Sequence, residues 1–113
     1  MTAPALGLLH TASSNRDRFG ALLREMAPPG VTWIHNVREE LLRDALDDVA
    51  EARQTAAISA ALAELHANGA AQVLCTCSSI GRRAELVGVR LGLPTLRVDR
   101  PMAERAVAQG RHI

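Results

Sequence analysis

The stretch NGAAQVLCTCSSIGRR, residues 68–83, contains the signals that decide the fold of this chain. Asn68-Gly69 is a helix stop, and the apolar run AQVLC at residues 71–75 predicts a strand. A turn of small polar residues then leads into a helical pattern over residues 79–92. A strand that lies between two helices in this way is typical of a parallel sheet.

The same alternation continues on both sides of this stretch. The chain up to residue 36 predicts two strands and, between them, a helix that Ser14 caps and APPG at 27–30 ends. Beyond residue 92 we expect a fourth strand, a helix opened by Pro101, and a fifth strand that begins near residue 111 and is cut short. The remaining predicted elements are strands at 5–10, 31–36 and 95–98 and helices at 39–66 and 101–110. In the helix at 39–66 one apolar stripe is predicted to be buried, formed by Leu42, Leu46 and Val49 and continued by Ile58, Leu62 and Leu65.

These elements predict one α/β unit over residues 1–113, a four-stranded parallel sheet with helices on both faces. The 13 basic and 12 acidic residues nearly cancel, and the chain has only two aromatic side chains, Phe19 and Trp33. We therefore expect no nucleic-acid partner. No apolar run is long enough to span a bilayer and no secretion signal is present, so we expect no membrane partner and a cytoplasmic location.

All 13 basic residues are Arg, so the chain contains no Lys. Without a Lys it can form neither the Schiff base of a pyridoxal phosphate enzyme nor a Walker-type phosphate loop. In a reducing compartment Cys75 and Cys77 are expected to be free thiols. We therefore expect chemistry that uses no cofactor.

In sheets of this kind ligands bind beyond the carboxyl ends of the strands, where loops enter helix N-termini. Cys77 is predicted to lie in such a turn, where main-chain N–H groups favour an anion or a thiolate. A thiol with a pKa near 8.5 is about 3 % ionised at neutral pH, and a pKa one unit lower makes that about a quarter. Cys77 is therefore the candidate base or nucleophile, whereas Cys75 ends an apolar run and is expected to be buried.

Four stretches of the chain resemble the aspartate/glutamate/hydantoin racemase family of cofactor-independent racemases and related decarboxylases. The central one is the most specific, because the family has a Cys followed by two small polar residues at this strand-to-helix turn, as Cys77-Ser78-Ser79 does here. The stretches are GLLHTASS at 7–14, EELLRD at 39–44, NGAAQVLCTCSSIG at 68–81 and LPTLRVDRPMAERAVAQGRHI at 93–113.

The resemblance implies a flavodoxin-like lobe, one half of a pseudo-twofold, two-lobed racemase. In the family one cysteine thiolate removes the proton next to a substrate carboxylate and a thiol on the opposite face returns one. By resemblance Cys77 is the first of these cysteines, and the substrate carboxylate or amino group is bound by polar residues of the two turns. Those candidates are Thr11, Ser13, Ser78 and Ser79. From the residues themselves, His10 is either a further polar group at the mouth of the site or a residue that packs the loop, and His35 is expected to be structural.

The chain also departs from the family pattern. Arg38 stands where relatives have an acidic residue, and the second half that carries the second cysteine does not follow within these residues. We expect either a missing C-terminal half or two copies that pair as a homodimer. In both cases the isolated lobe should lack two-base racemase activity.

Three other interpretations remain open from the residues alone. Cys77 and Arg83 have the Cys-x5-Arg spacing of cysteine phosphatases, although Ala84 replaces the hydroxyl residue that usually follows. A non-catalytic small-molecule-binding or assembly domain would keep the anion-binding turn without the second acid. A metal site formed by Cys75, Cys77, His10 and His35 lacks paired ligand spacing, and we expect no metal.

Overall fold

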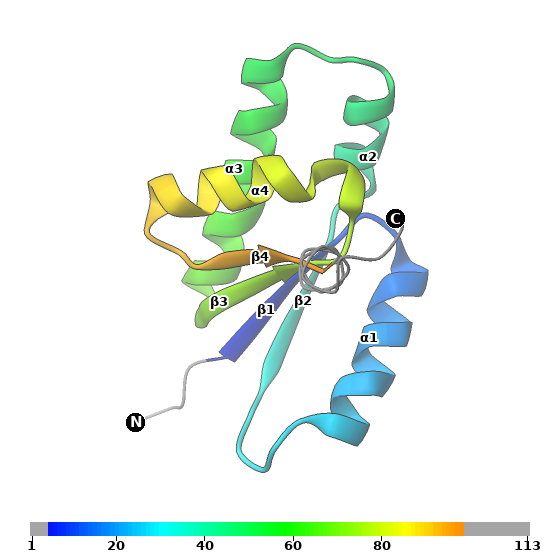
Figure 1. The fold of residues 1–113 in the computed structure, drawn as a ribbon, viewed down its shortest axis with the longest axis vertical. Coiled ribbons are helices and arrows are strands. Elements are labelled where there is room, and N and C mark those ends of the chain that lie inside the picture. Colours follow the sequence, from blue (N-terminus) through cyan, green and yellow to red (C-terminus); the bar gives the residue numbers. More distant parts are fainter. Residues whose placement is uncertain (1–4, 99–113) are drawn as a thin grey trace, which may run out of the picture.

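A computed structural model describes residues 5–98 of the chain, over which strands and helices alternate (Figure 1). The strands are β1 (Ala5–His10), β2 (Trp33–Val37), β3 (Ala70–Cys75) and β4 (Thr95–Arg97). The helices are α1 (Ser13–Met26), α2 (Glu39–Leu46), α3 (Glu51–Ala67) and α4 (Ser78–Leu91). The predicted helix at 101–110 and the predicted strand near 111 lie outside the described residues.

The four strands form one parallel sheet in the order β2-β1-β3-β4. Figure 1 shows α1 on one side of this sheet and α2, α3 and α4 on the other. Right-handed crossovers explain this division, because the chain reverses direction across the sheet after β2. The predicted parallel α/β fold is confirmed, and the strand order is consistent with a flavodoxin-like lobe.

The hydrophobic core lies between the sheet and helices α3 and α4. Leu9 of β1 and Val73 of β3 point toward this side, where they meet Ile58 and Leu62 of α3 and Ala84 of α4. All five side chains are at most 3 % exposed, and together they remove a large apolar area from water. The buried helical stripe of Ile58, Leu62 and Leu65 is confirmed.

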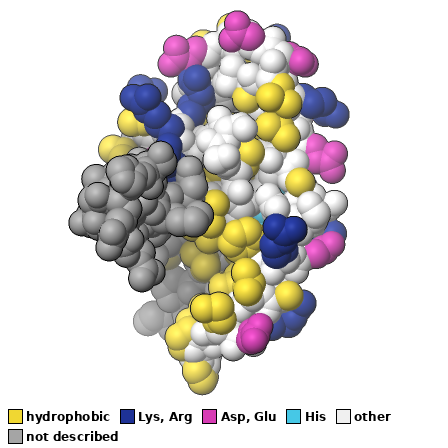
Figure 2. All heavy atoms as spheres, turned by 45° about the vertical axis from the view of Figure 1, so that its right-hand side comes forward, with side chains coloured by type: hydrophobic (Ala, Val, Ile, Leu, Met, Phe, Trp, Pro, Cys, Tyr) yellow, Lys and Arg dark blue, Asp and Glu magenta, His cyan; other side chains and the backbone are white. Residues whose placement is uncertain are grey.

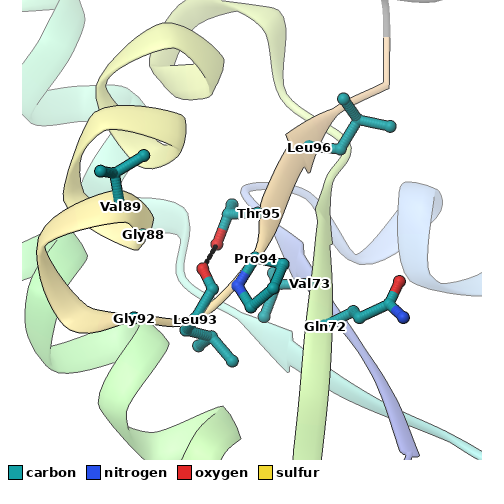
Figure 3. A pocket seen from close by; sticks show the side chains of 9 residues that line it. All are labelled: Gln72, Val73, Gly88, Val89, Gly92, Leu93, Pro94, Thr95 and Leu96. Atoms are coloured by element: carbon teal, nitrogen blue, oxygen red, sulfur yellow. Dashed lines mark hydrogen bonds between the residues drawn. The ribbon is translucent and has the colours of Figure 1, made fainter.

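Helix α4 packs so closely on β4 that only glycine fits at one contact. A Cβ atom at Gly88 would lie 2.4 Å from the Thr95 hydroxyl oxygen and 2.7 Å from the Leu93 carbonyl oxygen. The Thr95 hydroxyl donates to that carbonyl at 2.9 Å, which fixes it against the helix (Figure 3). At the end of the preceding helix, Gly69 has φ +106°, as the predicted Asn68-Gly69 stop requires.

The prediction of one continuous helix over residues 39–66 is wrong. Helix α2 ends at Leu46 and α3 begins at Glu51, and Asp48 between them has φ +56°. Aspartate adopts this left-handed conformation more readily than most residues, which lets the chain turn without glycine. As a result Leu46, expected on the buried stripe, is 72 % exposed, and Leu41 is the buried residue of α2.

The predicted cap at Ser14 is also wrong. Helix α1 begins at Ser13, and its N-cap residue is Ala12, which has extended φ and ψ and makes no side-chain capping bond. Asn15 N–H donates to the Ala12 carbonyl at 3.1 Å, so the first turn closes through the main chain. Ser14 therefore lies exposed inside the first turn.

The α1 side of the described fold retains an uncovered apolar surface. A hollow of about 420 Å³ is lined by Leu6, Phe19, Leu23, Met26 and Val31 with their neighbours, and Met26 is 74 % exposed. Figure 2 shows hydrophobic side chains gathered on the lower part of one face, with charged groups around them. None of the helices described between residues 5 and 98 has the length and apolar character to cross a membrane.

Candidate functional site at the carboxyl ends of the strands

The topological switch point of the sheet lies between β1 and β3. Their carboxyl ends are neighbours, since Leu9 pairs with Cys75 in the register, but β1 leads to α1 on one face and β3 to α4 on the other. Open parallel sheets bind ligands in the crevice at such a point. The residues that follow the two strands, Thr11 and Cys77, are therefore at the expected place for a binding site.

Cys77 is the N-cap residue of α4. Its backbone is extended, with φ −109° and ψ 115°, and its side chain makes no capping hydrogen bond. The residue thus directly precedes the first turn of α4, where main-chain N–H groups and the helix dipole favour an anion. Access is limited, because Cys77 is only 8 % exposed and belongs to the same buried cluster as Leu41 and Ile80.

Cys75 is the last residue of β3 and is fully buried, as predicted. Its Sγ–H donates to the carbonyl of Cys77 at 3.6 Å, so it supports the turn from inside the core. Both cysteines are free thiols. Cys75 is therefore inaccessible to a ligand, whereas Cys77 is at the boundary between core and surface.

Thr76, between the two cysteines, points to the opposite face of the sheet. Its hydroxyl oxygen is 2.8 Å from Nδ1 of His10, and Nε2 of His10 is 2.8 Å from Nδ1 of His35 on β2. The same hydroxyl donates to the Leu9 carbonyl at 3.3 Å. Three neighbouring strands are thus joined near their carboxyl ends by one chain of side chains, buried at His10 and Thr76 and half-buried at His35, which we call the imidazole chain (His35, His10 and Thr76).

The imidazole chain is neutral at physiological pH. Burial, followed by the charges of His35 and Arg16, lowers the pKa of His10 to about 4. The pKa of His35 is lowered first by burial and then by Arg16. Each hydrogen bond of the chain has one donor and one acceptor if both rings carry their proton on Nδ1. His35 then donates to Nε2 of His10, His10 donates to the Thr76 hydroxyl, and Thr76 donates to the Leu9 carbonyl.

The sequence-predicted binding residues do not all meet at Cys77. His10 is fully buried in the imidazole chain rather than at the mouth of a site, and Thr11 is 5 % exposed. Ser13 and Ser78 are exposed as the first residues of α1 and α4. Ser79 lines a separate hollow with Gln54, Arg82 and Arg83, among others.

Sequence reasoning missed Thr76 and the role of His35. The signal was present, because side chains alternate along a strand and His10 is the residue after Leu9, just as Thr76 is the residue after Cys75. Extending that parallel register by one position places His10 beside Thr76. The residues alone predict a structural role for His35 and leave His10 between the mouth of a site and the packing of a loop; neither prediction includes the bond between the two rings.

Arg83 is not arranged to bind a phosphate together with Cys77. Its guanidinium donates to the Thr55 hydroxyl at 3.2 Å and forms a 3.2 Å ion pair with Glu51, both on α3. Residues 78–83 are already helical, so the loop that a cysteine phosphatase wraps around its substrate is not formed. The Cys-x5-Arg spacing here joins α4 to α3.

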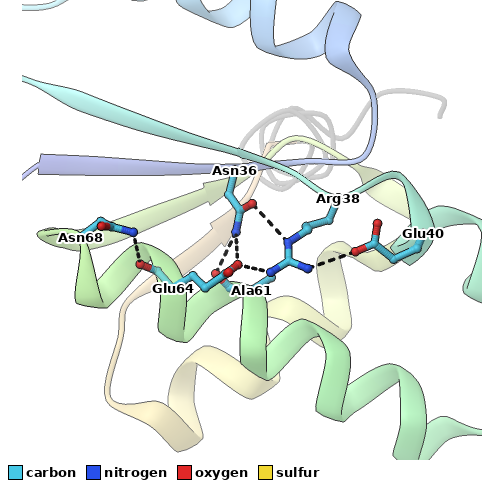
Figure 4. Close-up of polar contacts among 6 residues, drawn as sticks. All are labelled: Asn36, Arg38, Glu40, Ala61, Glu64 and Asn68. Atoms are coloured by element: carbon cyan, nitrogen blue, oxygen red, sulfur yellow. Dashed lines mark hydrogen bonds and ion pairs between the residues drawn. The ribbon is translucent and has the colours of Figure 1, made fainter.

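A second polar cluster holds the carboxyl end of β2 to α3 and α2 (Figure 4). Arg38 donates to Asn36, Glu40 and Glu64, and Asn36 donates to Glu64 and to the Ala61 carbonyl. The hydrogen bond from Arg38 lowers the pKa of Glu64, and the same bond raises the pKa of Arg38. Arg38, noted in the sequence as a departure from the family pattern, thus has a structural partner in each neighbouring element.

An apolar hollow lies at the other end of the sheet. It measures about 550 Å³ and is lined by residues at the start of β3 and β4 and the end of α4, including Gln72, Val89 and Pro94 (Figure 3). These positions are far along the strands from Cys77, and the lining offers few polar groups to orient a substrate. We therefore place the candidate site at the switch point and not in this hollow.

Within residues 5–98 no group of three or more His, Cys, Asp or Glu side chains is arranged to hold a metal ion. Comparison of the chain with protein-family models, with curated proteins and with solved structures gives no match.

Proposed function

We propose that this chain is a racemase-type lobe in which Cys77 transfers a proton at the carbon next to a substrate carboxylate. The observation that carries the proposal is the position of Cys77, a free thiol at the N-terminus of α4 and at the switch point of a parallel sheet. The resemblance to the aspartate/glutamate/hydantoin racemases supports it through Cys77-Ser78-Ser79 and the first-strand stretch.

The substrate carboxylate would be bound between the starts of α1 and α4. Thr11, Ser13 and Ser78 offer hydroxyl groups there, and both helix N-termini offer main-chain N–H groups. Deprotonation of the neighbouring carbon spreads negative charge onto this carboxylate, so the same donors would stabilise the transition state. Because Cys77 is 8 % exposed, binding must also shift the turn enough to uncover the sulfur.

The proposed reaction needs only proton transfer. The Cys77 thiolate takes the α-proton and becomes a thiol, and the electron pair of the broken C–H bond is delocalised into the carboxylate. A second acid on the opposite face then protonates the carbon and inverts it, supplied by a C-terminal half or by a second copy. No cofactor takes part, and a reducing, cytoplasmic setting would keep the thiol active.

Deuterium exchange at the α-carbon tests this proposal. The chain is incubated in D2O with aspartate, glutamate, a hydantoin or a malonate-type acid, and exchange is followed by proton NMR. One base without a second acid predicts exchange with retention of configuration. Cys77→Ser should lower the rate by about 100-fold or more, the usual contribution of a positioned base.

Cys75→Ser is the matched control, because it removes the neighbouring, fully buried thiol and keeps a hydroxyl donor for the Cys77 carbonyl. This variant should exchange as fast as the wild-type chain. Equal exchange by wild type and Cys77→Ser would contradict the proposal. No exchange by any form, with intact folding, would also count against catalysis by this lobe.

A second candidate function is ligand binding without chemistry. The observation that favours it is the inclusion of Cys77 in the buried cluster, which leaves little sulfur surface for a substrate. Isothermal titration with the same acids separates the two functions. Heat of binding that is equal in wild type and Cys77→Ser, without exchange in either, would identify a binding or assembly domain.

A further inference from the structure

The turn that carries Cys77 is held from the α1 side by the imidazole chain. The Thr76 hydroxyl, directly before Cys77, contacts His10 at 2.8 Å and the Leu9 carbonyl at 3.3 Å. Thr76 N–H also donates to that carbonyl, at 3.0 Å. Thr76 is 7 % exposed and His10 is fully buried, so water does not compete for these bonds.

The other side of the turn is held as well. Val98 N–H donates to the Cys75 carbonyl at 2.9 Å, and Cys75 Sγ–H donates to the Cys77 carbonyl. The bond from His10 is the contact in this set that a side chain of the neighbouring strand β1 makes to the turn. Its loss would free the Thr76 side chain to rotate and would let the residue that follows it move.

We propose that His10 is a positioning residue for Cys77: through Thr76 it fixes the turn that keeps the sulfur covered at the start of α4. The proposal deepens the proposed function, on which it rests, by naming the contact that controls access to the catalytic thiol. His10 itself does not touch the sulfur side of the turn, because His10 and Thr76 face α1 whereas Cys77 faces the core.

The charge state of the imidazole chain should control this contact. The groups that face it are Arg16, Asp17 and Arg24, all on α1, together with the Phe19 ring and the Thr76 hydroxyl. A proton added at Nε2 of His10 would point at the Nδ1–H of His35, and two donors cannot share one hydrogen bond. Repulsion between these two donors would displace the His10 ring and, with it, the bond to Thr76, which the absence of the His35 bond alone does not do. Acid is therefore expected to loosen the turn and expose Cys77.

Two amide substitutions separate the two bonds of His10. An Asn side chain places its NH2 group near the position of Nδ1, so His10→Asn can keep the bond to Thr76 and lose that to His35. A Gln side chain reaches the position of Nε2, so His10→Gln can keep the bond to His35 and lose that to Thr76. The readout is the rate at which iodoacetamide alkylates Cys77, measured with Cys75→Ser as the common background, because the serine hydroxyl can keep the bond to the Cys77 carbonyl.

We expect His10→Asn to alkylate at the background rate and His10→Gln about tenfold faster, the effect of one buried hydrogen bond on local opening. Thr76→Val should behave like His10→Gln, and Thr76→Ser, which restores the hydroxyl, like the background. Equal rates in all four variants, or a faster rate in His10→Asn than in His10→Gln, would overturn the proposal.

Dilute urea shows whether the label enters by local or global opening, because only global unfolding exposes enough surface to respond strongly. The rate in His10→Gln should be nearly independent of urea, and a steep dependence would assign the effect to overall stability.

A pH series gives a second readout that stability alone would not produce. With dithiodipyridine, which reacts with thiols in acid, trapping of Cys77 relative to free glutathione should rise between pH 6 and pH 4 in the background. His10→Asn should remove most of this rise, and a full rise in that variant would contradict the proposal. None of these labelling measurements uses substrate. They can therefore support the role of His10 even if the exchange assay contradicts the proposed function, and they can contradict that role even if exchange is observed.

Discussion

Strand β2 is joined to the rest of the fold by two polar clusters that differ in burial. The imidazole chain on the α1 side contains fully buried His10 and is neutral, whereas Arg38 and Glu64 on the α3 side are charged and Glu64 is about half exposed. Both clusters link the same strand to its neighbours. They should nevertheless differ several-fold in their contribution to stability.

The reason is competition with water. An exposed ion pair exchanges one set of favourable contacts for another and is screened by salt, so its net effect is small. A buried donor that loses its partner is left with no replacement, and the full desolvation cost appears in the free energy of unfolding. The comparison therefore teaches that the uncharged cluster is the stronger constraint on the switch point.

The largest expected effect is that of His10→Ala. It creates a cavity and leaves Thr76 and His35 without their common partner, so the free energy of unfolding should fall by about 3 to 4 kcal/mol. Urea denaturation followed by circular dichroism measures this. His66→Ala is the matched control, because exposed His66 makes one long contact to Ala70 and its loss should change stability little. Equal losses in the free energy of unfolding would mean that the buried His10 contributes no more to stability than the exposed His66.

Acid should weaken the imidazole chain and leave the Arg38–Glu64 ion pair charged. The folded pKa of His10, about 4, lies below its ordinary value of 6.5, so between these pH values the unfolded chain binds more protons. Stability from His10 is therefore complete above about pH 6.5 and is lost as the pH falls toward 4, by about 2 to 3 kcal/mol at pH 4.5.

Other groups also titrate in this range, so the comparison needs a reference. Urea denaturation gives the free energy of unfolding of wild type and His10→Asn at pH 7 and pH 4.5. The contribution of His10 is the loss between the two pH values in wild type minus the same loss in the variant. The wild-type chain should lose more stability than the variant. An equal loss in both would mean that His10 does not titrate as its burial requires.

The smallest effect is expected at Arg38. Replacing it with Met keeps the apolar stem and removes the guanidinium, and the free energy of unfolding should fall by less than about 1 kcal/mol. In 1 M NaCl the difference from wild type should shrink further, as screening predicts. A loss as large as that of His10→Ala, unchanged by salt, would reverse the comparison drawn above.

Much of the fold could be predicted from local signals. Apolar runs marked the strands to within two residues, and the Asn68-Gly69 stop ended α3 where the structure has it. The break at Asp48 escaped prediction because no glycine or proline marks it and an aspartate adopts φ +56° there. The predicted burial of Leu46 rested on the same continuous helical periodicity, so it is wrong for the same reason.

The candidate site could be predicted less completely. The position of Cys77 at the helix start followed from the order of strand, turn and helix, and the burial of Cys75 from the apolar run before it. The burial of His10 did not follow, because it depends on a partner 66 residues away in the chain. Ser79 likewise lines a hollow with residues of α3, although it is adjacent to Ser78 in sequence.

By itself the sequence determined the alternation of strands and helices and the two-sided character of each strand, because both follow from the spacing of apolar residues along a local stretch. The tertiary structure decided which polar side chains meet. Parallel register brought His10, His35 and Thr76 together on one face and sent Cys77 to the other. Such contacts depend on the relative placement of strands far apart in the chain, which no local pattern of residues specifies.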